Sequence, residues 1–120
     1  MLPASHNRAY QDFSNLLTKF SGFLINSEEQ VDQLQLKQKF QHLQSWFDGN
    51  IADLESDNLE QDVISRWQSV QTEIKREFKL LATDILFLTS ARQSSTLDKR
   101  LRSIKGRVAK LLSYCQIMNS

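Results

Sequence analysis

The sequence predicts an all-α fold: an antiparallel up-down-up-down four-helix bundle with a long third helix. Apolar residues recur at alternating spacings of three and four, as expected for helices that bury one stripe. The 120 residues include only 3 Gly and 1 Pro, residues on which the turns of β sandwiches and barrels depend. Short polar connectors separate the stripes, and such connectors join antiparallel neighbours. The length fits one helical domain, residues 1–120.

The first helix is expected over residues 5–25. Ser5 offers a hydroxyl that can cap its start, and the pattern breaks at Asn26-Ser27. Its apolar stripe consists of Tyr10, Phe13, Leu17, Phe20 and Leu24.

The second helix is expected over residues 28–55. Ser27 and Gln30 have the spacing of a capping box. Gly49 interrupts the helix, but apolar residues beyond it stay on the stripe, so we expect the helix to reach Glu55, with or without a bend at Gly49. The stripe consists of Val31, Leu34, Leu36, Phe40, Leu43, Phe47, Ile51 and Leu54.

The third helix is expected over residues 58–92, after the polar break Ser56-Asp57-Asn58. At a rise of ~1.5 Å per residue it would be about 50 Å long. This exceeds the first helix by about four turns, so the excess must protrude, bend or meet a partner. An extended helical hairpin is the alternative architecture. The stripe consists of Val63, Trp67, Val70, Ile74, Phe78, Leu81, Ile85 and Leu88.

The fourth helix is expected over residues 96–118, and Thr96 is a suitable N-cap. Its apolar residues alternate regularly between spacings of four and three, which makes it the clearest of the predicted helices. The stripe consists of Leu97, Leu101, Ile104, Val108, Leu111, Cys115 and Met118.

Composition narrows the functional classes. The formal net charge is +1, which gives no support to a dedicated nucleic-acid binder. A single cysteine, Cys115, allows neither an intrachain disulfide nor a cysteine-based zinc site. The sequence contains neither a transmembrane run of ~18 apolar residues nor a signal-peptide pattern. We therefore expect a cytoplasmic protein without membrane association.

Residues that carry catalysis or bind metals are scarce. The two histidines are His6, expected in a frayed terminus, and His42, expected at a helix surface. The sequence has no Glu-x-x-His pair of the kind that binds metal in di-iron bundles, and no glycine-rich phosphate loop. Cys115 falls on the core stripe, which favours a buried thiol over a nucleophile. We therefore expect no catalytic site, no metal and no cofactor.

Charge is distributed unevenly along the chain. One acidic group lies in the connector between the second and third helices: Asp53, Glu55, Asp57, Glu60 and Asp62. One basic group begins at the opposite end of the predicted bundle and follows the fourth helix: Arg92, Lys99, Arg100, Arg102, Lys105, Arg107 and Lys110. The basic group is interpreted first as a solvated face, second as a docking site for an acidic protein, and third as a nucleic-acid contact.

The run Leu80–Leu88 contains more apolar residues than one stripe can hold. Leu86 and Phe87 point away from the core positions, so they are either covered by other helices or form a partner or self-association surface. Asp84 within this run needs a basic partner if it is buried, either Arg92 or a basic residue of the fourth helix.

Trp46, next to Phe47, is a further aromatic residue beyond the core stripe, either as an interface anchor or as part of a wide core. The candidate partner-binding residues are therefore Asp84, Leu86, Phe87, Arg92, Arg100, Arg102, Lys105 and Trp46.

Three segments carry a family resemblance: the opening MLPASHNRAYQDF, the run LLATDILFLTSARQ (residues 80–93) and the ending LLSYCQIM. Together they resemble the cyanobacterial heterocyst frequency control protein PatD family. The resemblance implies a non-enzymatic cytoplasmic regulator of heterocyst frequency and cell division. It also implies a protein partner, the tubulin-like division protein FtsZ, whose assembly the regulator modulates. It supplies no binding residues.

Three functional hypotheses follow from the sequence. The first is a helical adaptor that binds a protein, with FtsZ as the implied partner. The second is a nucleic-acid-binding regulator that uses the fourth helix. The third is a homo-oligomeric scaffold whose interface is the apolar surface of the third helix.

Overall fold

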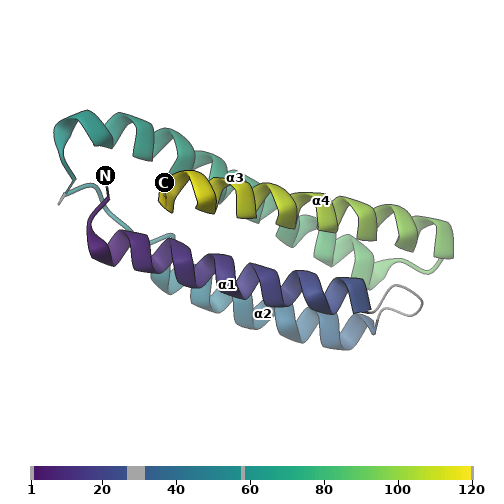
Figure 1. The fold of residues 1–120 in the computed structure, drawn as a ribbon. Coiled ribbons are helices and arrows are strands. Elements are labelled where there is room, and N and C mark those ends of the chain that lie inside the picture. Colours follow the sequence, from purple (N-terminus) through teal and green to yellow (C-terminus); the bar gives the residue numbers. More distant parts are fainter. Residues whose placement is uncertain (1, 27–31, 58, 120) are drawn as a thin grey trace.

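The computed structural model describes residues 2–26, 32–57 and 59–119. These residues form four helices and no strand: α1 (Ala4–Asn26), α2 (Gln33–Asn50), α3 (Gln61–Ser90) and α4 (Ser94–Asn119). Successive helices run in opposite directions, and α1 packs beside α4 to close the bundle (Figure 1). The predicted all-α, up-down-up-down four-helix bundle is confirmed.

The third helix is the longest of the described helices, with 30 residues. Its first turns reach past the end of α4, so the excess length protrudes at the end where the two termini lie (Figure 1). The whole molecule measures 50 × 21 × 19 Å, close to the length of α3 itself, because a helix of 30 residues spans about 45 Å.

The apolar stripes form the core. All five predicted stripe residues of α1 are buried, as are most of those of α3 and α4. Leu34 is an exception, with 65% of its surface exposed. It lies in the first turn of α2, and the core contact begins instead at Leu36, from which the buried residues follow at helical spacing. Val31 lies outside the described residues.

Phenylalanine rings fill the centre of the bundle. The rings of Phe47 and Phe78 stack at a centroid distance of 3.9 Å with an angle of 5° between their planes. Phe13 contacts Phe47 at 5.3 Å, and Phe40 stacks on Phe78 at 5.4 Å. Such ring pairs add to the hydrophobic free energy of burial, and this cluster joins α1, α2 and α3.

The second helix begins later than predicted. Residues 28–31 of the expected helix and the proposed capping box, Ser27–Gln30, lie outside the described residues. The observed cap is Asp32, whose carboxylate accepts hydrogen bonds from the backbone N–H groups of Leu34 and Gln35 at 3.0 and 3.1 Å. An acidic side chain is favourable there because it also faces the positive end of the helix dipole.

The second helix also ends earlier, at Asn50 instead of Glu55. The carbonyl of Ile51 accepts a hydrogen bond from the Gln71 side chain of α3 at 2.8 Å. That carbonyl is therefore turned toward α3, and Gly49 just before it is a weak helix former. The expectation that apolar periodicity would carry the helix to Glu55 was wrong.

The remaining boundaries differ from the predicted ones by one to three residues, within the usual scatter of helix ends. The first helix begins at Ala4, where the Pro3 carbonyl accepts from the Asn7 N–H group. The third begins at Gln61 instead of Asn58, which lies outside the described residues. It ends at Ser90 instead of Arg92, where the hydroxyls of Thr89 and Ser90 donate to the Leu86 carbonyl. The fourth helix covers Ser94–Asn119. In the part of the chain that the structure describes, no helix is long and apolar enough to cross a membrane.

Candidate functional site

Asp84 of α3 is buried against α4. Only 4% of its surface is exposed. Its carboxylate accepts hydrogen bonds from the Ser103 hydroxyl at 2.7 Å and from Nε of Arg107 at 2.6 Å. The Arg100 guanidinium approaches it to 3.5 Å. The prediction that Asp84 pairs with a basic residue of the fourth helix is confirmed, whereas the alternative partner, Arg92, is not the one used.

Glu77 lies two turns before Asp84 on the same face of α3 and is 1% exposed. Arg107 and Lys110 bind its carboxylate at 3.0 and 3.1 Å, and Arg76 approaches to 3.7 Å. Burial alone would raise the pKa of Glu77, but hydrogen bonds from Lys110 and Arg107 outweigh it and hold the pKa below its ordinary value. Both buried carboxylates are therefore satisfied across the α3–α4 contact.

These pairs change the interpretation of the basic group on α4. Arg100, Arg107 and Lys110 are engaged by carboxylates of α3. Their charge is largely balanced within the molecule, which weakens the interpretation of α4 as a phosphate-binding face. Asp84 is likewise part of the α3–α4 interior and offers no free carboxylate to a partner.

Leu86 and Phe87 are exposed on the outer side of α3, by 62% and 48%. The Arg100 guanidinium lies over the Phe87 ring, 4.6 Å from its centroid, in the geometry of a cation–π contact. Arg100 therefore contacts both Asp84 and the Phe87 ring. The bundle does not cover these two apolar side chains.

Lys99 is exposed on α4, one turn before Ser103, and Ser103 is bonded to Asp84. This spacing places Lys99 toward the α3 side of α4. We call Phe87, Lys99 and Arg100, together with the exposed Leu86 about 100° farther around α3, the α3–α4 surface. The sequence placed Lys99 only within the general basic group. What singles it out is the contact between Ser103 and Asp84.

The other candidate residues do not join this surface. At ~100° per residue, Arg102 and Lys105 lie on the side of α4 that turns away from α3. Arg92 is exposed just beyond the end of α3. Trp46 is half-buried on α2, where it stacks on Phe13 at a centroid distance of 5.9 Å. Arg100 thus brings Asp84 and Phe87 together. At ~100° per residue, Leu86 lies on the side of α3 that turns away from Asp84, so it joins Phe87 only as a neighbouring exposed apolar residue.

A second buried polar cluster lies at the end of the bundle that holds the termini. The Trp67 indole donates to the Tyr10 hydroxyl at 2.8 Å, and this hydroxyl donates to Gln71 at 2.7 Å. Burial raises the pKa of Tyr10 far above its ordinary value. Sequence reasoning missed this cluster, although Gln71 stands on the apolar stripe between Trp67 and Ile74. A polar residue at a stripe position was the available signal.

His6 belongs to the same end of the bundle. It was expected in a frayed terminus, but it is buried within α1. Its Nε2 lies 2.9 Å from the Glu55 carbonyl, and its ring meets Trp67 edge to face at 5.8 Å. His6 therefore fastens α1 to the connector between α2 and α3, and the expectation of fraying was wrong.

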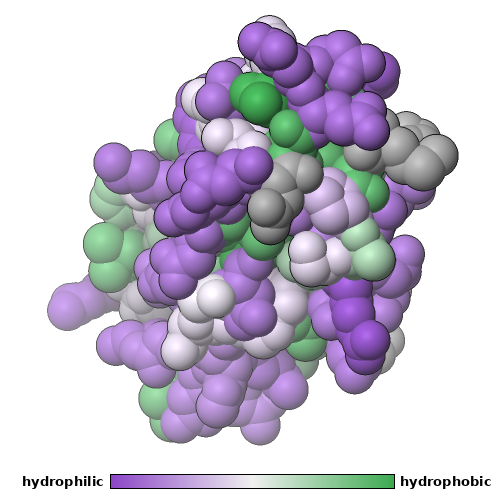
Figure 2. Space-filling model, turned by 90° about the vertical axis from the view of Figure 1, so that its left-hand side faces the viewer, coloured by the Kyte–Doolittle hydropathy of each residue, from purple (hydrophilic) through white to green (hydrophobic). Residues whose placement is uncertain are grey.

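The acidic group lies at this end as well, in the α2–α3 connector and the start of α3, whereas α4 begins at the opposite end (Figure 1). Viewed end-on, the surface here is mostly hydrophilic, with hydrophobic atoms visible between the polar side chains (Figure 2).

The described residues contain no group of three or more His, Cys, Asp or Glu side chains placed to hold a metal ion. Cys115 is fully buried in the core, and burial raises the pKa of its thiol to about 12. A thiol in that state is a poor nucleophile near neutral pH.

No family model, no curated protein and no solved structure matches this chain. A proposal about function therefore depends on the side chains described above and on the family resemblance of the three segments MLPASHNRAYQDF, LLATDILFLTSARQ and LLSYCQIM.

Proposed function

We propose that this protein is a non-enzymatic regulator that acts by binding another protein through the α3–α4 surface. The partner we propose is FtsZ, whose assembly the regulator modulates, and the process is the control of heterocyst frequency and cell division. The partner and the process rest on the resemblance to the PatD family. The choice of surface rests on the geometry.

One observation carries the choice of surface: Leu86 and Phe87 stay exposed on α3, while Leu81, Ile85 and Leu88 of the same run are buried. Leaving these two side chains largely exposed forgoes part of the about 1.5–3 kcal/mol that full burial of each would contribute. Surface patches of this kind, with charge at their border, are typical of protein contacts.

The chemistry of the surface indicates the kind of partner that fits it. Phe87 is held by Arg100, so the aromatic ring is presented in one orientation and loses little freedom on binding. Arg100 shares its charge with Asp84, so the positive charge offered to a partner near Phe87 comes mainly from the exposed Lys99. A matching patch on the partner would be apolar in the middle and acidic at its border, which favours rapid association.

Co-sedimentation with FtsZ filaments tests the proposal. The wild-type protein at micromolar concentration is expected to pellet with the filaments and to change the amount of FtsZ that assembles. The double variant Leu86→Ser with Phe87→Ser is expected to stay in the supernatant, because it removes the apolar centre of the surface. Circular dichroism confirms that the variant is folded.

Leu34→Ser is the matched control. Leu34 is as exposed as Leu86, at 65%, but it lies on α2, so its loss is expected to leave binding unchanged. To test whether the positive charge of this surface contributes to binding, we prefer charge reversal at Lys99. Reversal at Arg100 would place a carboxylate against Asp84 and would destabilise the fold. An absence of both pelleting and assembly change for the wild type would rule out FtsZ. Equal binding by the double variant would rule out this surface.

A further inference from the structure

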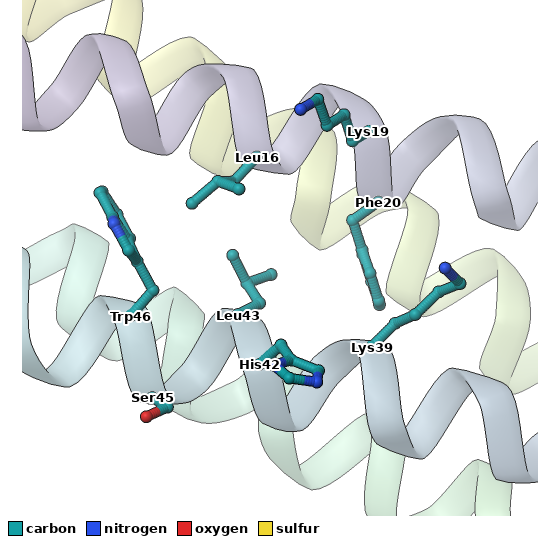
Figure 3. Close-up of a pocket in the computed structure, with 8 residues that line it drawn as sticks. All are labelled: Leu16, Lys19, Phe20, Lys39, His42, Leu43, Ser45 and Trp46. Carbon is teal, nitrogen blue, oxygen red and sulfur yellow. The ribbon is translucent and has the colours of Figure 1, made fainter.

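A groove of about 620 Å³ runs along the contact between α1 and α2 (Figure 3). Leu16 and Phe20 of α1 and Leu43 and Trp46 of α2 form its apolar lining. The rings and methyl groups of these side chains point into the space between the two helices (Figure 3). From Lys39 to Trp46 the groove follows α2 for about 10 Å, or about two helical turns.

The charged side chains that line the groove are basic. Lys19 of α1 and Lys39 of α2 both line it, and Lys39 extends toward α1 at the Phe20 end, whereas Lys19 lies along α1 (Figure 3). The ammonium group of Lys39 also lies 5.1 Å from the centroid of the Phe23 ring, which fixes it at the Phe20 end of the groove. No acidic side chain is among the described residues that line it. In this respect it differs from the α3–α4 contact, where carboxylates balance the basic residues.

The groove and the α3–α4 surface lie on different sides of the molecule. The pair α1 and α2 forms one side of the bundle, and the pair α3 and α4 forms the other (Figure 1). A ligand in the groove would therefore leave Leu86 and Phe87 accessible, so a site here is independent of the proposed function.

We propose that this groove binds an acidic amphipathic helix of a partner protein. Its lining is apolar along the middle and positive at the rim, the complement of a helix with apolar residues on one face and carboxylates beside them. The groove is open on its outer side, so it would leave much of a small ligand in water, whereas small-molecule sites cover most of their ligand. A helix needs only one face covered.

A synthetic peptide of about 14 residues, or about four helical turns, tests the proposal. It carries leucines at helical spacing with glutamates at the remaining positions. A second peptide has the same leucines with lysines in place of the glutamates. Anisotropy of a fluorescent label on each peptide reports binding to the full chain. We expect the acidic peptide to bind and to shift the emission of Trp46, a shift that Trp46→Phe removes. The lysine peptide is expected not to bind.

The double variant Lys19→Glu with Lys39→Glu is expected to bind the acidic peptide at least about tenfold more weakly, because two attractive contacts become repulsive. Lys37→Glu is the matched control: it makes the same charge change on α2 at an exposed residue outside the groove, and binding should be unchanged. Added salt should weaken the wild-type complex.

Several results would overturn the proposal. Equal binding of the two peptides would show that the rim does not select an acidic helix. The same conclusion would follow if Lys37→Glu weakened binding of the acidic peptide as much as the Lys19→Glu and Lys39→Glu double variant does. Binding of dodecanoate with no binding of the peptide would assign the groove to a small amphiphile. A fall in molecular mass on charge reversal at Lys19 and Lys39, measured by light scattering, would assign it to a second copy of the chain. Failure of FtsZ binding leaves this site unaffected.

Discussion

At the scale of single residues, Glu77 shows how the chain tolerates buried charge. A buried carboxylate is costly unless charged hydrogen-bond donors surround it, and Glu77 has Arg107 and Lys110 within 3.1 Å. Neither basic residue is fully buried, with 28% and 52% of their side chains exposed. Water therefore still solvates the Arg107 and Lys110 side chains, while the Glu77 carboxylate stays buried.

This arrangement predicts acid sensitivity at Glu77. Its pKa is lowered in the folded state from an ordinary value of 4.5. Its stabilising contribution is therefore complete above pH 4.5 and is lost as the pH falls from there through the lowered pKa. Glu77→Gln should reduce the free energy of unfolding by about 1–3 kcal/mol at neutral pH, and this reduction should shrink progressively as the pH falls below 4.5. Urea denaturation followed by circular dichroism at neutral pH and at a series of pH values below 4.5 measures the change.

Glu73→Gln is the control for this prediction. Glu73 lies one turn earlier on α3, its side chain is 42% exposed, and it pairs with Arg76. Exposed pairs contribute little, so this variant should lose little stability at either pH. A loss at Glu77 that does not shrink at any pH below 4.5 at which the protein stays folded would contradict the assigned role of its charge.

Sequence reasoning reached part of this residue-level picture. Within the run Leu80–Leu88, Asp84 needed a basic partner because it was surrounded by apolar residues, and the fourth helix supplies that partner. Glu77 was missed, although it stands on the core stripe between Ile74 and Leu81. The stripe was read from its apolar members alone, so charged residues at stripe positions passed unnoticed.

At the scale of elements, periodicity predicted helices better than it predicted where they end. The stripes identify the buried faces because burial acts on every turn of a helix. Ends depend on single contacts: Asp32 caps the start of α2, and Gln71 binds the carbonyl of Ile51 just after its end. The second contact comes from a residue 20 positions away, which local sequence does not reveal.

Gly106 allows a prediction about helix propensity in α4. It lies well inside Ser94–Asn119 and is exposed, and a Cβ added there would meet nothing within 4 Å. Gly106→Ala should therefore raise the free energy of unfolding by about 0.5–1 kcal/mol, since alanine restricts the unfolded chain and favours the helix. The midpoint of guanidinium denaturation should rise while its slope stays the same.

Gly49→Ala provides the comparison. A Cβ at Gly49 also has open space, but this residue is next to the last of α2. Helix propensity contributes less to stability at a fraying helix end, so Gly49→Ala should raise the free energy of unfolding by less than Gly106→Ala does. A larger gain at Gly49 would mean that its lack of a side chain, and not the contact between Ile51 and Gln71, ends α2.

At the scale of the whole molecule, the two long faces of the bundle differ in how they use basic residues. Across α3 and α4, basic side chains balance buried carboxylates and leave an exposed apolar pair. Across α1 and α2, basic side chains border an apolar groove without an acidic lining residue in the described chain. A net charge of +1 conceals this difference.

Self-association through the α3–α4 surface is the alternative use of Leu86 and Phe87. A two-fold contact would bring this surface against itself, so that the exposed Lys99 residues of both copies would lie within one contact. Like charges meeting across a contact are unfavourable, and two apolar side chains fall well short of the ~800 Å² per partner that a stable dimer buries. We therefore expect a monomer.

Small-angle X-ray scattering over a concentration series tests this expectation. The Cα radius of gyration is 15.3 Å, above the ~13–14 Å of a compact chain of this length, because the bundle is elongated. The measured radius should exceed 15.3 Å only by the contribution of side chains and hydration. It should stay constant with concentration and be the same in the variant that carries Leu86→Ser and Phe87→Ser. A radius that grows with concentration in the wild type, and does so less in this variant, would establish the α3–α4 surface as a self-interface, since only association through those two side chains would respond to their loss.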